Sequence, residues 1–123
     1  MRLDLDRPTG INIVRAVAPG EILVGDRVIR TSVIIAATDI IPDWPVSSTR
    51  DIDERSLAPA MDLCPDILLL GTGSVLTFPG REVHASVLSR NIGLEVMATA
   101  AACRTYNILA AEGRNVVAAL ILG

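Results

Sequence analysis

The sequence predicts a single α/β domain built around a central sheet. Half of its 123 residues are hydrophobic and its formal net charge is only −3, which is the composition of a chain that buries a core. From residue 65 onward, apolar runs typical of buried strands alternate with helical patterns, in the order strand–helix–strand–helix–strand. This alternation favours a sheet with helices packed against it. The length is close to the usual size of one domain, so we assign residues 1–123 to a single domain.

The N-terminal half is predicted to contain short strands. A largely apolar run, Asn12–Ala18, is followed by two β-rich runs, Glu21–Val24 and Arg27–Arg30. The Gly-Asp pair between these two runs is typical of a tight hairpin turn. Thr31–Ala37 continues with β-branched residues, either as the next strand or as an extension of the hairpin arm.

A loop and a short helix are predicted to join the two halves. Asp39–Ser48 contains two prolines, which favour a loop or an irregular edge strand. Trp44, in the middle of this segment, is expected to fold back over the core. Asp53 is suited to cap a short helix within Asp51–Asp62, because its carboxylate can accept N–H bonds from the first turn.

The C-terminal half is predicted to supply the central strands and two helices. The strands are Asp66–Leu70, which reads as buried on both faces, Leu94–Met97 and Val116–Leu122. One helix spans Arg81–Arg90 and is expected to bury a stripe formed by Val83, Val87 and Leu88. The other helix is expected to run from an N-cap at Thr99 to Glu112.

Composition excludes several kinds of function. All eleven cationic residues are arginine, so Schiff-base chemistry and a phosphate-binding lysine loop are excluded. The acidic balance and the presence of only three aromatic residues give no basis for binding nucleic acid. No apolar run approaches the roughly 18 residues of a membrane span. The start, Met1–Asp6, does not resemble a targeting signal, so a cytoplasmic protein is expected.

No metal or cofactor site is predicted. The chain has two cysteines, Cys64 and Cys103, and one histidine, whereas a structural zinc site needs about four ligands. Both cysteines are expected to fill the core. His84 has no acid or nucleophile one helical turn away, which argues against a catalytic triad.

Two loops are the candidate functional site. Gly71-Thr72-Gly73-Ser74 follows one predicted strand and Met97-Ala98-Thr99 follows the next. In open α/β sheets ligands bind beyond the carboxyl ends of parallel strands, so these loops would face each other across one cleft if their strands are neighbours. The glycines allow close backbone approach, and the hydroxyls and helix amides could hold an anion or a carboxylate. The alternative is a tight structural turn.

The last helix adds Arg104 and Asn107 to this site. They lie three residues apart and are therefore neighbours on the helix surface, where they could bind a carboxylate or a backbone amide. The alternatives are a solvated face and internal bonding to a loop. The sheet-facing side is expected to include Ala101, Ile108 and Leu109, and Tyr106 is expected at the edge of the core.

Motifs in the C-terminal half resemble those of a known family. They are Asp66–Gly73, Gly93–Met97, Thr99, Ala102, the triplet Thr105-Tyr106-Asn107, Leu109 and Glu112-Gly113-Arg114. On these residues the chain resembles a family of small domains of unknown function that includes the mitochondrial complex I assembly factor 3 and an adipogenesis-associated protein. The resemblance extends over the whole chain and is sharpest from Asp66 to Ile121.

The resemblance implies a three-layer α/β fold with a central mixed sheet, helices on its faces and extra N-terminal strands. It therefore implies that one strand of the sheet runs against the others. Family members commonly carry an acidic residue just before the position of Thr99, where this chain has Ala98. If that carboxylate serves catalysis in the family, this chain lacks the activity, which disfavours an enzyme.

Two functions remain as hypotheses. The first is a non-catalytic protein-interaction or assembly-accessory domain, which the resemblance implies. The second is a domain that binds a small molecule or an anion, or a weak enzyme, and uses the cleft between Gly71–Ser74 and Met97–Thr99. The chain is expected to be a monomer or a homodimer paired through its N-terminal strands.

Overall fold

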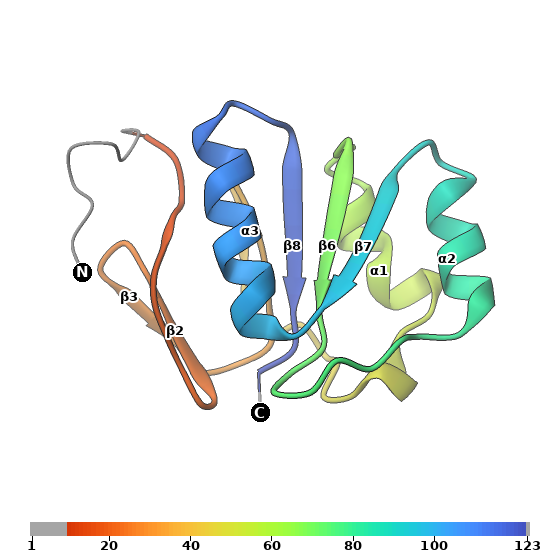
Figure 1. The fold of residues 1–123 in the computed structure, drawn as a ribbon, viewed down its shortest axis with the longest axis horizontal. Helices are drawn as coiled ribbons and strands as arrows, with labels where there is room; N and C mark the ends of the chain where they lie inside the picture. The colour runs from red at the N-terminus through yellow and green to blue at the C-terminus, as the bar shows by residue number, and fades with distance from the viewer. Residues whose placement is uncertain (1–9, 123) are drawn as a thin grey trace.

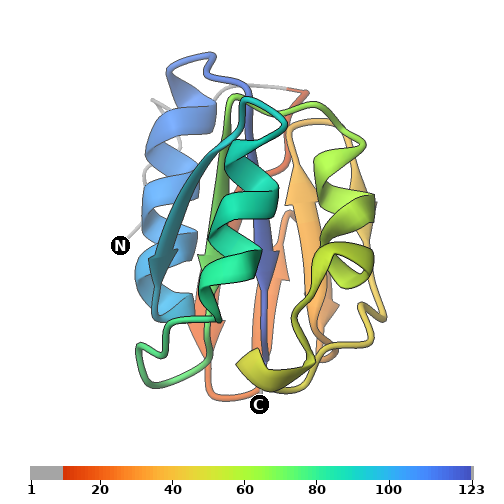
Figure 2. The same ribbon diagram turned by 90° about the vertical axis from the view of Figure 1, so that its right-hand side faces the viewer.

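The computed structural model describes residues 10–122 and has three layers. A five-stranded sheet lies in the middle, α1 and α2 cover one face, and α3 with a three-stranded sheet covers the other (Figures 1 and 2). In chain order the elements are β1 (Val14–Ala18), β2 (Glu21–Val24), β3 (Arg27–Ile29), β4 (Val33–Ala36), β5 (Ile40–Ile41), η2 (Thr49–Asp51), α1 (Glu54–Met61), β6 (Ile67–Gly71), α2 (Arg81–Leu88), β7 (Gly93–Met97), α3 (Thr99–Ala111) and β8 (Val116–Leu120).

The five-stranded sheet is mixed, as the resemblance implied. Its strand order is β5-β4-β8-β6-β7. β6 pairs in parallel with both β7 and β8, which confirms the prediction of strands joined by helical crossovers. β4 runs antiparallel to β8 and to β5. The carboxyl ends of β6, β7 and β8 therefore share one edge, with Gly71, Met97 and Leu120 at the strand ends.

The three-stranded sheet confirms the predicted hairpin. β2 and β3 pair antiparallel around a turn in which Gly25 has a φ of +58°, a conformation that favours glycine. Of the two alternatives for Thr31–Ala37, the next strand is correct, because β4 joins the five-stranded sheet. The predicted loop or edge after it contains β5, a two-residue strand at the end of that sheet.

The core has two parts, one on each face of the central sheet. Leu68 and Leu70 point toward α1 and α2, whereas Leu69 points toward α3 and the three-stranded sheet. Trp44 folds back as predicted: it is buried, and its Nε1 donates a hydrogen bond to the Ser56 carbonyl at 2.8 Å. Because both faces are covered, the central strands read as continuous apolar runs.

The two predicted helix caps have different outcomes. Asp53 is the N-cap of α1, where its carboxylate accepts from the Ser56 amide at 2.8 Å and the Ser56 hydroxyl accepts from the Asp53 amide at 2.9 Å. The prediction for Thr99 is wrong, because Ala98 is the N-cap of α3 and Thr99 is the first helical residue. The Thr99 hydroxyl is engaged elsewhere, as described below.

Three burial predictions are wrong. Leu88 and Ile108 are exposed, because the buried side of α2 is limited to Val83 and Val87 and because α3 turns a different stripe toward the sheet. That stripe consists of Thr99, Ala102, Cys103, Tyr106 and Ala110. Cys64 is also exposed, in a turn between α1 and β6 where its φ is +54°. No helix within residues 10–122 is long and apolar enough to cross a bilayer.

Candidate functional site

The two predicted loops lie side by side at the carboxyl ends of β6 and β7. The Gly73 amide donates to the Thr99 hydroxyl at 2.8 Å, and the Thr99 amide donates to the Gly73 carbonyl at 2.8 Å. The Thr99 hydroxyl then donates to the Ile121 carbonyl at 2.7 Å. With an exposed fraction of 5%, the Thr99 side chain is buried, and its hydroxyl serves contacts within the fold. We call this arrangement of Gly73, Thr99 and Ile121 the threonine clasp.

Gly71 allows the chain segments at this edge to approach one another closely. A Cβ atom at this position would lie 2.9 Å from the Leu120 Cδ2 atom and 3.0 Å from both the Cα and the Oγ1 atom of Thr99. The Gly71 carbonyl also accepts a hydrogen bond from the Ile121 amide at 2.9 Å. Gly71 is therefore explained by packing, which is the structural alternative that the sequence left open.

Thr72 shapes the second half of the connection from β6 to α2. Its hydroxyl donates to the Val75 carbonyl at 2.7 Å and accepts from the Thr77 amide at 3.2 Å. The Thr72 amide donates to the Met97 carbonyl at 2.9 Å, which ties the loop to the end of β7. Ser74 is exposed at the tip. The backbone of this loop is thus held by its own side chains and by β7.

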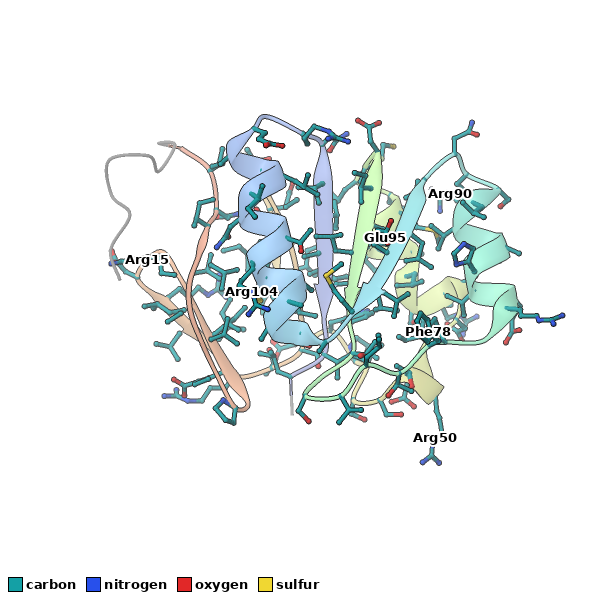
Figure 3. All side chains as sticks on the ribbon, in the orientation of Figure 1. Arg15, Arg50, Phe78, Arg90, Glu95 and Arg104 are labelled. Atoms are coloured by element: carbon teal, nitrogen blue, oxygen red, sulfur yellow. The ribbon has the colours of Figure 1, made fainter. Side chains whose placement is uncertain are left out.

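Three exposed apolar side chains project from the loop that Thr72 holds. Val75, Leu76 and Phe78 have exposed fractions of 66%, 49% and 69%. Figure 3 shows Phe78 on the loop that leads into α2. None of these three residues is among those that the sequence predicted for the site. The sequence did contain a signal for this exposed group: three large apolar residues fall among four consecutive positions inside a segment predicted to be a loop.

Arg104 and Asn107 have different surroundings on α3. Arg104 is exposed (Figure 3). The Asn107 side-chain amide is bonded to β1, since its Oδ1 accepts from the Val14 amide at 2.9 Å and its Nδ2 donates to the Val14 carbonyl at 2.7 Å. Asn107 thus attaches the three-stranded sheet to α3. The clasp residues are joined by hydrogen bonds, whereas Asn107 is engaged with β1.

Comparison with known proteins identifies the family. The model of a family described as a protein of unknown function, DUF498/DUF598, matches residues 14–121. The chain belongs to this family.

Several relatives with names are assembly factors. The chain is 33% identical over 122 residues to the NADH dehydrogenase (ubiquinone) 1 alpha subcomplex assembly factor 3 of Xenopus tropicalis, covering 98% of this chain and 66% of the relative. The mouse protein of the same name is 33% identical over 121 residues, covering 97% of this chain and 64% of the relative. The chain thus spans just under two thirds of the length of these relatives.

A solved structure with the same fold covers almost the whole chain. A crystal structure of a Bordetella parapertussis protein has a TM-score of 0.87 at 39% identity and covers 94% of this chain and 98% of that chain. A solution structure from Bordetella pertussis, described as an Mth938-like domain, has a TM-score of 0.83 at 33% identity and covers 98% of this chain and 92% of that chain.

Ala98 marks a difference between this DUF498/DUF598 member and the pattern expected from the resemblance. Ala98 occupies the N-cap of α3 and makes no side-chain capping bond. The acidic residue expected there would lie at the positive end of the helix dipole. In this chain the amides at the start of α3 therefore face the carboxyl edge of the sheet without a carboxylate at residue 98.

The titratable groups with shifted pKa values are explained by the fold. Burial raises the pKa of the Cys103 thiol to about 12 and also raises the pKa of the Tyr106 hydroxyl. That hydroxyl donates to the Asn12 carbonyl at 2.8 Å. Hydrogen bonds from the Ser47 amide and hydroxyl lower the pKa of Asp51. Within residues 10–122, no three His, Cys, Asp or Glu side chains form a group that could hold a metal ion.

A surface depression of about 400 Å³ lies between α1 and the end of α2. It is lined by Asp53, Glu54, Arg55, Ala58 and Arg90, and it includes none of the seven residues predicted for the site. Arg90 at its rim pairs with Asp62 at 3.1 Å. The depression has two acidic and two basic side chains, so its lining favours neither anions nor cations.

Proposed function

We propose that this DUF498/DUF598 protein is a non-catalytic protein-interaction domain that accompanies the assembly of other proteins in the cytoplasm. Its contact surface is the segment from Ser74 to Phe78, which we call the apolar loop. The observation that carries the proposal is the exposure of Val75, Leu76 and Phe78 on a backbone that Thr72 holds in place.

The physical argument concerns the cost of binding. Large apolar side chains grouped on a surface are typical of interaction sites, and buried aromatic residues supply much of the energy of protein contacts. A loop that is ordered before binding loses less conformational entropy when a partner covers it. The threonine clasp and the Thr72 bonds order this loop in the free protein. The names of the assembly-factor relatives support the same kind of role.

The chemistry of the clasp favours this function over binding of a small molecule. The Thr99 hydroxyl is buried and bonded to two backbone groups, and Thr72 is bonded to the loop it supports. Anion recognition at this edge would have to rely on helix amides and on Arg104. The apolar loop offers three side chains that need a partner's apolar surface rather than a charged ligand.

The proposal is tested by quantitative co-purification with the full chain. Tagged wild-type protein is compared with Phe78→Ser and with Val28→Ser, a control that removes another exposed apolar side chain, from β3. We expect one or more proteins to be enriched with the wild type and the control and to be reduced at least tenfold with Phe78→Ser, about 1.4 kcal/mol or more for a central aromatic contact.

Two results would contradict this function. One is equal enrichment with Phe78→Ser and the wild type. The other is the absence of any enriched protein together with thermal stabilisation by phosphate, nucleotides or carboxylates. A ligand at 100 times its dissociation constant should add about 2.7 kcal/mol to the free energy of unfolding. That second result would indicate that the carboxyl edge of the central sheet binds a small anion.

A further inference from the structure

The outer edge of β7 is unpaired in the structure. β7 is the last strand of the sheet order and pairs only with β6 among residues 10–122. The Gly93 amide and the Met97 carbonyl bond toward the β6 side, to the Asp66 carbonyl and the Thr72 amide. Backbone groups alternate in direction along a strand, so the N–H and C=O groups of Leu94 and Val96 point outward. They offer two donors and two acceptors to an added strand.

An apolar side chain flanks this edge on the α2 side of the sheet. Leu94 and Val96 pack into the core shared with α1 and α2, so their side chains lie on that face. α2 runs between α1 and β7 in Figure 2, and Arg90 at its end reaches toward α1 to pair with Asp62. By helical geometry Leu88 lies on the opposite side of α2, toward β7, with an exposed fraction of 51%.

A single carboxylate lies on the other face of β7. Glu95 alternates with Leu94 and Val96 and is exposed on the α3 side of the sheet (Figure 3). Within residues 10–122, Glu95 has no ion pair and no side-chain hydrogen bond. An added strand would therefore meet Leu94, Val96 and Leu88 on one face, with His84 one helical turn before Leu88 on the same side of α2, and one negative charge on the other face.

We propose that β7 binds an extended segment of a partner protein as a sixth strand. The segment carries a basic residue opposite Glu95 and an apolar residue on each side of it, which pack against Leu94, Val96 and Leu88. Strand addition of this kind takes its affinity from main-chain hydrogen bonds and its specificity from alternate side chains. The inference rests on the proposed protein-interaction function but uses a surface separate from the apolar loop.

The charge of Glu95 distinguishes such a partner from a second copy of this chain. Two copies of β7 that pair antiparallel over all five residues must place Glu95 opposite Glu95. Like charges directly opposite each other destabilise strand pairing, and a central charge is a common device that keeps edge strands from self-association. A basic residue at the same position replaces this repulsion with attraction.

The test uses the full ¹⁵N-labelled chain and a blocked probe peptide of sequence Gly-Thr-Val-Arg-Val-Thr-Gly. Its matched control has Glu in place of the central Arg. We expect the Arg probe to shift the amide signals of Leu94, Val96 and Leu88 and to bind about tenfold more tightly than the Glu probe. In Glu95→Lys the preference is expected to reverse, so that the Glu probe binds more tightly.

The outcomes separate this inference from the proposed function. Absence of shifts at Leu94 and Val96 with millimolar Arg probe, or an unchanged probe preference in Glu95→Lys, would overturn strand addition at β7. Wild-type protein that dimerises on ultracentrifugation with the same two amides perturbed would make a second copy the occupant and would also overturn it. Neither readout depends on Phe78, so the apolar loop can fail or succeed independently.

Discussion

The connection from β6 to α2 has two halves that differ in almost every physical property. The first half, Gly71 to Gly73, is packed against Thr99 and bonded to it and to Ile121. The second half, Ser74 to Phe78, exposes three large apolar side chains on an ordered backbone. The difference shows that the Thr72 and Thr99 hydroxyls hold the fold, while the large side chains exposed on this connection are apolar.

The largest effect is expected from removing the hydroxyl of the threonine clasp. Thr99→Val leaves the Gly73 amide and the buried Ile121 carbonyl without their partner while keeping nearly the same volume. Unsatisfied buried groups cost about 1–3 kcal/mol each, and the Gly73 amide, which is only partly buried, lies at the low end of this range, so the free energy of unfolding should fall by about 2–4 kcal/mol. Urea unfolding followed by circular dichroism measures this change.

Thr99→Ser is the matched control for the clasp. Serine keeps the hydroxyl and loses one methyl group, so it should destabilise by only about 1 kcal/mol. If Thr99→Val proved as stable as Thr99→Ser, the hydroxyl would be dispensable to the fold and available to a ligand. The contrast between the two halves of the connection would then disappear.

A smaller loss is expected at Gly71. In Gly71→Ala the new methyl group would contact Leu120, which is fully buried, and the backbone of Thr99. Overpacking of this kind costs about 1–3 kcal/mol. Gly93→Ala is the control, because a Cβ there lies 3.5 Å from the nearest atom, the Asp66 carbonyl oxygen, and should be tolerated within about 0.5 kcal/mol. Equal melting temperatures for the two variants would show that Leu120 and Thr99 can move apart to make room for a side chain at residue 71.

The order of the central elements could be predicted from the sequence because they depend on local patterns. β6 and β8 are continuous apolar runs, the β2–β3 hairpin has a Gly-Asp turn, and α1 has its cap at Asp53. Each of these signals involves only neighbouring residues. The resemblance, rather than periodicity, supplied the mixed direction of the sheet, since the antiparallel pairing of β4 with β8 joins segments far apart in the chain.

The candidate site was predicted less fully because its chemistry depends on contacts distant in sequence. The sequence placed Gly71–Ser74 next to Thr99, and the structure brings Gly73 and Thr99 together. The sequence could not show that the Thr99 hydroxyl donates to the Ile121 carbonyl. Nor could it show that the Asn107 side-chain amide is hydrogen-bonded to the backbone of Val14, in the three-stranded sheet. The burial of Leu88 and Ile108 was predicted wrongly because the exact rotation of a helix depends on what packs against it.

The smallest effect on stability is expected for Phe78→Ser, the substitution for which we expect the largest effect on partner binding. Phe78→Ser removes a side chain that is 69% exposed, so the free energy of unfolding should change by less than about 0.5 kcal/mol. Thermal unfolding of Phe78→Ser beside the wild type measures this change. Nearly equal melting temperatures would show that any loss of partner binding in Phe78→Ser comes from the missing surface side chain and not from unfolding. A loss of 2 kcal/mol would instead show that Phe78 packs in solution, and would contradict the assignment of the apolar loop as a surface waiting for a partner.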